Sequence, residues 1–189
     1  MRNEGKSTWN PARLDAMAFA RAEGRVSGQL ALSALSRLTE DLHDRALVGA
    51  APPVEWVLSG ELRPGAGGAD PDAWLHLQAT ASVPLTCQRC LGAVQTPLEI
   101  DHWFRMVADE AAAEAQDDDC EEDLLALEPL PNLVEVLEDE LIMGLPLVPM
   151  HEECPQGLVN PAEDRSLPAT EAEEKPHPFA ALAALKKAK

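Results

Sequence analysis

The feature that most constrains the fold is a period-two alternation of apolar and polar residues, which extends from Trp74 to Met106 with one interruption. Side chains of a strand alternate between the two faces of a sheet, so this pattern indicates strands with one buried face. The apolar positions are Leu75, Leu77, Ala79, Ala81, Val83 and Leu85, then Val94, Leu98, Ile100, Phe104 and Met106. Pro97 falls on the other parity and indicates an edge or a bulge. We therefore predict a long hairpin with the sequence CQRCLG, residues 87–92, at its tip.

Weaker patterns on both sides of the hairpin predict the remaining elements. Apolar residues alternate over residues 26–32 and 54–62, which indicates two further strands. One helix is expected between Pro11 and Gly24, and another after Ser33, whose side chain can cap its N-terminus. Residues 131–144 carry an apolar stripe at helical spacing. These segments predict an α+β fold with a central antiparallel sheet, twisted or barrel-like, a few packed helices and a flexible C-terminal tail.

The length of the chain, 189 residues, suffices for one domain with its own core and a tail. Aromatic residues make up only 4% of the chain, so the core must consist mainly of Leu, Val and Ala. We place a single domain at residues 10–158. Residues 159–178 are poor in large apolar groups and are expected to form a flexible linker. Residues 179–189, with Phe179, Leu182 and Leu185 at helical spacing, predict a short C-terminal helix.

The formal charge of −18 is concentrated in one region. Between Val107 and Leu141 there are fourteen acidic residues and no Lys, Arg or His, and an acidic loop is expected at about residues 108–123. The phosphates of a nucleic acid would be repelled, so extensive direct binding of RNA or DNA is disfavoured. A basic protein partner would be attracted instead. A solvated loop that only promotes solubility is equally compatible with this composition.

The sequence contains no apolar stretch long enough to cross a membrane, and the segment MRNEGKSTWNPARLDA lacks the apolar part of a signal peptide. We therefore expect a cytoplasmic protein without a membrane partner. Thiols are kept reduced in the cytoplasm. The four cysteines are accordingly better explained as metal ligands, reactive groups or small apolar residues than as a disulfide framework.

Cys87 and Cys90 form a C-x-x-C motif at the predicted hairpin tip. Such a turn can direct two thiolates at one metal ion, and His151 with Cys154 would supply the two remaining ligands of a structural zinc site. A redox pair is a second interpretation, but it requires a thiolate at a helix N-terminus, and both flanks here are strand-like. A structural or partner-facing turn with free thiols is the third. The residues alone leave all three open.

Motifs of catalysis are absent from the sequence, which has no glycine-rich phosphate loop, serine elbow or pair of histidines at helical spacing. His43, His76, His102 and His177 occur singly, as structural or solvent-facing histidines usually do. Cys120 lies among acidic residues, which disfavour its thiolate. We therefore predict a protein that is not an enzyme.

Three motifs together resemble the signature of the YceD family, the large ribosomal RNA subunit accumulation proteins. They are LTCQRCLG at 85–92, LEDELIMGLPLVPMHEEC at 137–154 and KPHPFAALAALKK at 175–187. The positions that the resemblance marks as binding residues are Cys87, Gln88, Arg89, Cys90, Glu138, Asp139, Glu140, Pro178 and Phe179. His177 and Gly144 depart from the residues common in the family, asparagine and alanine, which concerns only the local geometry.

The resemblance implies a non-enzymatic factor for the synthesis, processing or stability of large-subunit (23S) ribosomal RNA. Combined with the charge pattern, it leads to the hypothesis that the acidic surface holds a basic ribosomal protein or assembly factor. The ribosomal RNA would then be contacted only indirectly or locally. One alternative is a zinc-binding adaptor or chaperone unrelated to ribosomes. Another is a thiol oxidoreductase that uses Cys87.

Overall fold

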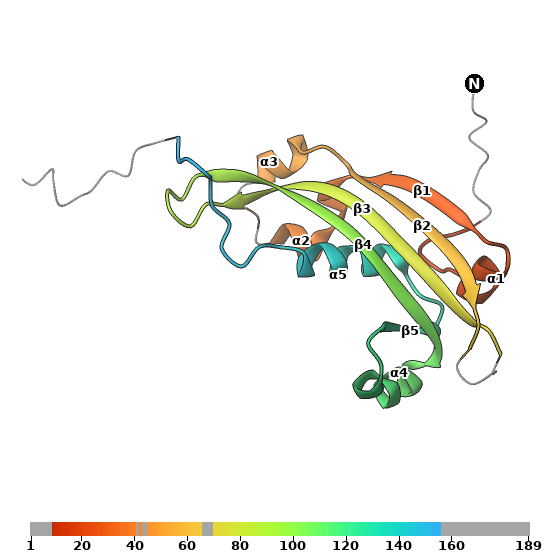
Figure 1. Ribbon diagram of the computed structural model, residues 1–189. Helices are drawn as coiled ribbons and strands as arrows, with labels where there is room; N and C mark the ends of the chain where they lie inside the picture. Colours follow the sequence, from red (N-terminus) through yellow and green to blue (C-terminus); the bar gives the residue numbers. More distant parts are fainter. Residues whose placement is uncertain (1–8, 41, 43–44, 66–69, 156–189) are drawn as a thin grey trace, which may run out of the picture. The chain divides into compact units, whose positions relative to one another are not determined.

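The computed structural model describes residues 9–40, 42, 45–65 and 70–155 (Figure 1). Met1–Glu153 forms one compact unit, and the second unit, Cys154–Lys189, contributes only Cys154 and Pro155 to the described residues. The predicted linker at 159–178 and the predicted helix at 179–189 lie outside this part of the chain, as do Pro178 and Phe179. None of the helices in the described part is long and apolar enough to span a membrane.

A five-stranded sheet forms the centre of the first unit, and it confirms the predicted α+β class. The strands are β1 (Arg25–Leu30), β2 (Val54–Arg63), β3 (Asp72–Thr86), β4 (Ala93–Asp109) and β5 (Asp123–Glu128), in this order across the sheet. The predicted hairpin is confirmed, because β3 and β4 pair antiparallel from Thr86 opposite Ala93 to Trp74 opposite Arg105. The sheet is open at both edges, so the barrel-like alternative is wrong.

The last strand makes the sheet mixed rather than wholly antiparallel, since β5 pairs with β4 in parallel. Parallel neighbours need a crossover connection between them. Here α4 (Glu110–Gln116) and a 3-10 turn (Asp117–Asp119) provide it. The acidic stretch predicted as a loop at about 108–123 is therefore helical over part of its length. Alanine is the best helix former, and the Asp109 side chain caps α4 by accepting a hydrogen bond from the Ala112 N–H at 2.9 Å.

Helices pack against one face of the sheet. They include α1 (Ala16–Arg21), α2 (Ser36–Glu40) and α5 (Leu133–Met143), which lie together on that face in Figure 1. The buried core between the layers contains Leu14, Phe19, Leu38, Leu58, Leu75, Leu77, Leu137 and Leu141. The prediction of a core built from aliphatic residues is thus confirmed, with Phe19 as its largest fully buried side chain.

The segment after β1 differs from the single helix predicted after Ser33. It consists of a 3-10 turn (Leu32–Ala34), α2 and a separate helix, α3 (Arg45–Ala50). The cap of α2 comes from another element, because the Glu138 Oε1 of α5 accepts hydrogen bonds from the backbone N–H groups of Arg37 (2.7 Å) and Leu38 (3.1 Å). A carboxylate at this position satisfies N–H groups that lack a partner within the helix. A side chain one hundred residues away therefore decides where this helix begins.

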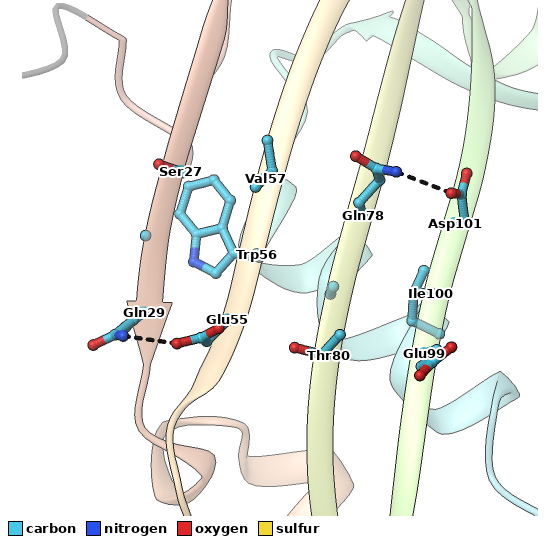
Figure 2. A pocket seen from close by; sticks show the side chains of 12 residues that line it. Ser27, Gln29, Glu55, Trp56, Val57, Gln78, Thr80, Glu99, Ile100 and Asp101 are labelled. Atoms are coloured by element: carbon cyan, nitrogen blue, oxygen red, sulfur yellow. Dashed lines mark hydrogen bonds between the residues drawn. The ribbon is translucent and has the colours of Figure 1, made fainter.

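The opposite face of the sheet carries polar side chains, and a shallow hollow of about 810 Å³ lies on it. Figure 2 shows the side chains that line this hollow. Neighbouring strands are linked there by side-chain hydrogen bonds, from Gln29 to Glu55 at 3.1 Å and from Gln78 to Asp101 at 2.9 Å. Such cross-strand pairs are the usual stabilising units of a solvated sheet face. The polar side chains of this hollow are therefore explained by their cross-strand pairs on a solvated sheet face.

His102 on β4 links three elements, namely β4, β5 and α5. Its Nδ1 lies 2.8 Å from the Glu140 carboxylate of α5, and its Nε2 pairs with the Asp123 carboxylate of β5. Burial lowers the pKa of His102, but the hydrogen bond and charge of Glu140, together with Asp123, outweigh it and raise the pKa above its usual value. When protonated, the imidazole can donate to both carboxylates and so ties β5 and α5 to β4.

The stability that His102 provides should depend on pH. Because its folded-state pKa is raised, this stability is fully present below the unfolded pKa of about 6.5 and is lost as the pH rises through the folded value. We expect His102→Gln to lower the free energy of unfolding more at pH 5.5 than at pH 8.5, as measured by urea unfolding. In the Glu140→Gln variant the same replacement should lose most of this pH dependence. A pH-independent effect of His102→Gln would contradict stabilisation by a protonated His102 between Glu140 and Asp123.

Candidate metal centre

The C-x-x-C motif forms the turn that closes the β3–β4 hairpin. The Cys87 N–H donates to the Gly92 carbonyl at 2.9 Å, and the Leu91 N–H donates to the Cys87 carbonyl at 2.9 Å. Leu91 has a φ of 60°, in the left-handed region that a non-glycine residue rarely adopts. The turn is thus tightly wound, and this brings the side chains of Cys87 and Cys90 to the same side.

A second segment, residues 145–153, follows α5 and lies against this turn. The Gln88 N–H donates to the Pro149 carbonyl at 2.9 Å. The Arg89 guanidinium donates to the carbonyls of His151 (2.6 Å) and Glu152 (3.1 Å). Two residues that the family resemblance marks, Gln88 and Arg89, therefore bind the segment that carries the second pair of candidate ligands.

The four predicted metal ligands lie together. One ligand atom from each of Cys87, Cys90, His151 and Cys154 lies within 4.8 Å of every other. The Cys90 Sγ is 3.4 Å from the His151 Nδ1, and Cys87 is fully buried. Cys154, the first residue of the second unit, follows His151 by only three positions along the chain. Cys120, the remaining cysteine, is not part of the cluster and contacts the Glu122 carbonyl instead.

The imidazole of His151 is oriented for coordination. Its Nε2 lies 3.0 Å from the Ala93 carbonyl oxygen, which can only accept a hydrogen bond. The Nε2 must therefore carry the proton, and in the neutral ring this leaves the Nδ1 lone pair directed toward the Cys90 sulfur. A backbone carbonyl that holds the second nitrogen is the arrangement usually found behind a metal-bound histidine.

The electrostatic environment favours a thiolate at Cys87. Burial raises the pKa of this thiol, but hydrogen bonds from the backbone N–H groups of Cys90, His151 and Arg89 outweigh burial. Together they lower the pKa to about 5. The thiolate is the form of cysteine that binds metals. Three sulfurs and one imidazole nitrogen around a common point can hold a metal ion.

Three further residues marked by the resemblance, Glu138, Asp139 and Glu140, have partners inside the fold. Glu138 is only 6% exposed and binds Arg37 as well as the start of α2. Asp139 is exposed and pairs with the same guanidinium at 2.5 Å. Glu140 binds His102. Sequence reasoning missed Arg37 and His102, because a lone arginine and a lone histidine carry no signal of partners that are distant in the chain.

Comparison with known proteins places this chain in a family. Residues 75–186, more than half of the chain, match the family described as large ribosomal RNA subunit accumulation protein YceD. A protein of the same description from Haemophilus influenzae is 35% identical over 111 residues, which are 55% of this chain and 60% of that relative. The chain thus matches about three fifths of the length of this curated relative. No solved structure matches significantly. With both parts of the four-ligand cluster inside the matched range, the chain belongs to the YceD family.

Proposed function

We propose that the protein is a non-enzymatic cytoplasmic factor that supports accumulation of large-subunit (23S) ribosomal RNA by binding a basic ribosomal protein or assembly factor. The observation that carries the proposal is membership of a family named for accumulation of this RNA. The name describes an effect on RNA abundance, whereas the net charge of −18 disfavours an extensive grip on phosphates. A basic protein partner that itself binds the RNA would account for both the effect on RNA abundance and the negative charge of this chain.

The distribution of carboxylates supports a protein partner. Between the end of β4 and the end of β5, nine of the acidic side chains whose burial the structure describes are exposed, and we call them the acidic α4–β5 surface. They are Asp109, Glu110, Glu114, Asp117, Asp118, Glu121, Glu122, Asp123 and Glu128. The sequence has no Lys, Arg or His within the same stretch. Such a surface attracts cationic proteins at long range and accelerates their association.

The four-ligand cluster fits a structural zinc ion within this proposal. Three cysteines and one histidine are a common zinc-binding set, and protein ligands then fill all four positions. Bound there, zinc would supply a cross-link and not a site for substrate. Cys87 and Cys90 would connect the hairpin tip to His151 and Cys154 after α5. The arrangement would hold rigid the face formed by the turn and residues 145–153.

The proposal is tested by comparing two probes at about 150 mM salt, where charges beyond roughly 8 Å are screened. The probes are individually purified basic proteins of the large subunit and protein-free 23S ribosomal RNA. We expect at least one ribosomal protein to bind and the RNA not to bind tightly. Depletion of the factor in cells should lower 23S but not 16S ribosomal RNA.

A charge-matched pair of variants makes the test specific to the acidic surface. Glu110→Gln/Glu114→Gln/Asp118→Asn should slow association of the basic protein, while Glu40→Gln/Asp70→Asn/Glu99→Gln, also exposed, should not. Tight binding of naked RNA would contradict the proposal. Stoichiometric zinc in a protein that binds no ribosomal component would favour the alternative of an adaptor or chaperone unrelated to ribosomes.

A further inference from the structure

A groove of about 1110 Å³ lies beside the candidate metal centre. It is lined by residues 93–97 of β4 and by residues 146 and 148–153 of the segment after α5, and we call it the β4 groove. Sites for small molecules usually occupy about 300–1,000 Å³ and enclose the ligand. The β4 groove is larger and runs along an extended segment, so its dimensions fit a stretch of polypeptide better than a small molecule.

Large apolar side chains gather around this groove. In the described residues, seven such side chains are exposed, and five of them lie in the C-x-x-C turn, at the last residue of α5 or between α5 and the metal centre: Leu91, Met143, Leu147, Val148 and Met150. Leu147 is fully exposed, and Val148 and Met150, which line the groove, are more than half exposed. Exposed apolar groups scattered singly need no explanation, but a concentration of them marks an interaction surface. Methionine is also common on surfaces that adapt to partners.

The charge of the groove selects among possible occupants. Glu152 and Glu153 line it and are exposed, and none of the described lining residues is Lys or Arg. Among the lining residues, phosphates would therefore meet two carboxylates and no Lys or Arg side chain. A second copy of this chain, with a net charge of −18, would be repelled as well. An apolar segment flanked by Lys or Arg complements both the exposed side chains and the two carboxylates.

We propose that the β4 groove is where the basic partner docks, through an extended apolar segment flanked by Lys or Arg. This inference rests on the proposed function and adds the place and the chemistry of recognition. The acidic α4–β5 surface and the β4 groove act at different steps of binding. Charges of the acidic α4–β5 surface accelerate encounter, whereas contacts with Val148 and Met150 in the groove hold the partner once it is bound.

This division predicts a kinetic difference between two sets of variants. Val148→Ser/Met150→Ser should increase the dissociation rate of the bound ribosomal protein by about tenfold and leave its association rate nearly unchanged. Leu62→Ser/Leu130→Ser removes two other exposed apolar side chains without changing the charge, and should alter neither rate. The acidic-surface variant Glu110→Gln/Glu114→Gln/Asp118→Asn should instead slow association. Metal content and melting temperature show whether each variant keeps its fold.

Photo-crosslinking locates the contact directly. Benzoylphenylalanine is placed at Met150 in the groove and, as a control, at Gln78 on the polar sheet face, and the probe is the total protein extracted from purified large ribosomal subunits. We expect crosslinks from position 150, but not from 78, to a peptide with apolar residues between Lys or Arg. Crosslinks only from 78, or an unchanged dissociation rate in Val148→Ser/Met150→Ser, would overturn the groove while leaving the proposed function intact. A concentration-dependent dimer that the same variant dissolves would identify a second copy as the occupant and also overturn it. Absence of binding by any large-subunit protein or large-subunit assembly factor would overturn both.

Discussion

Replacing Cys90 with serine is expected to abolish stoichiometric metal binding and to lower the melting temperature by roughly 8–16 °C. A metal present at a thousand times its dissociation constant stabilises the folded state by about 4 kcal/mol, and 1 kcal/mol shifts the melting temperature of a chain of this size by about 2–4 °C. Cys90 is the ligand in direct contact with His151, at 3.4 Å. Its loss leaves an incomplete set in which Cys87 and His151 are aimed at a common point.

The chain offers a matched control in its fourth cysteine. Cys120→Ser removes a thiol of intermediate exposure outside the cluster and should change neither metal content nor melting temperature appreciably. Cys154→Ser should behave like Cys90→Ser, and a chelator should lower the stability of the wild type toward that of both variants. Elemental analysis of protein purified without chelator, followed by calorimetry, measures both quantities. A wild-type protein that is folded, metal-free and indifferent to added zinc would refute the metal centre.

The second large effect is expected for Glu138→Ala, which should lower the free energy of unfolding by about 3 kcal/mol, the range for breaking a buried charged network. The Glu138 side chain is 8% exposed, whereas the Arg37 side chain is 48% exposed. When the ion pair is broken, water can therefore solvate the arginine side chain but cannot reach the buried position of the carboxylate. Without the carboxylate, the N–H groups of Arg37 and Leu38 lose their acceptor beneath α5. The start of α2 and its packing on α5 should both weaken.

Glu135→Ala provides the comparison, because this residue lies on the same helix with an exposed side chain. Only its backbone carbonyl accepts from Arg37, and the substitution keeps that group. Its effect should stay within about 0.5 kcal/mol, as for most surface substitutions. Urea unfolding, with a check that the slope of the transition is unchanged, separates the two cases. Equal effects of Glu138→Ala and Glu135→Ala would show that Glu138 does not organise the start of α2.

Most of the described residues marked by the family resemblance make contacts within the fold. Glu138, Asp139 and Glu140 bind Arg37 and His102, and the resemblance alone assigned them to binding without indicating these partners. Gln88 and Arg89 likewise hold the segment that carries His151. Stability of the fold is a sufficient physical reason for carboxylates at 138 and 140. The exposed apolar groups around the β4 groove, unlike Glu138 and Glu140, have no such role in the fold and remain available to a partner.

The sequence by itself determined the β3–β4 hairpin, the position of the C-x-x-C turn at its tip and the aliphatic core. These features depend on neighbours in the chain, since alternation over consecutive residues already states which face of a strand is buried. The parallel pairing of β5, the start of α2 and the convergence of Cys87 and Cys90 on His151 were decided only by the tertiary structure. Each of these depends on residues up to about a hundred positions apart, and their meeting is set by how helices and strands pack, which no local pattern encodes.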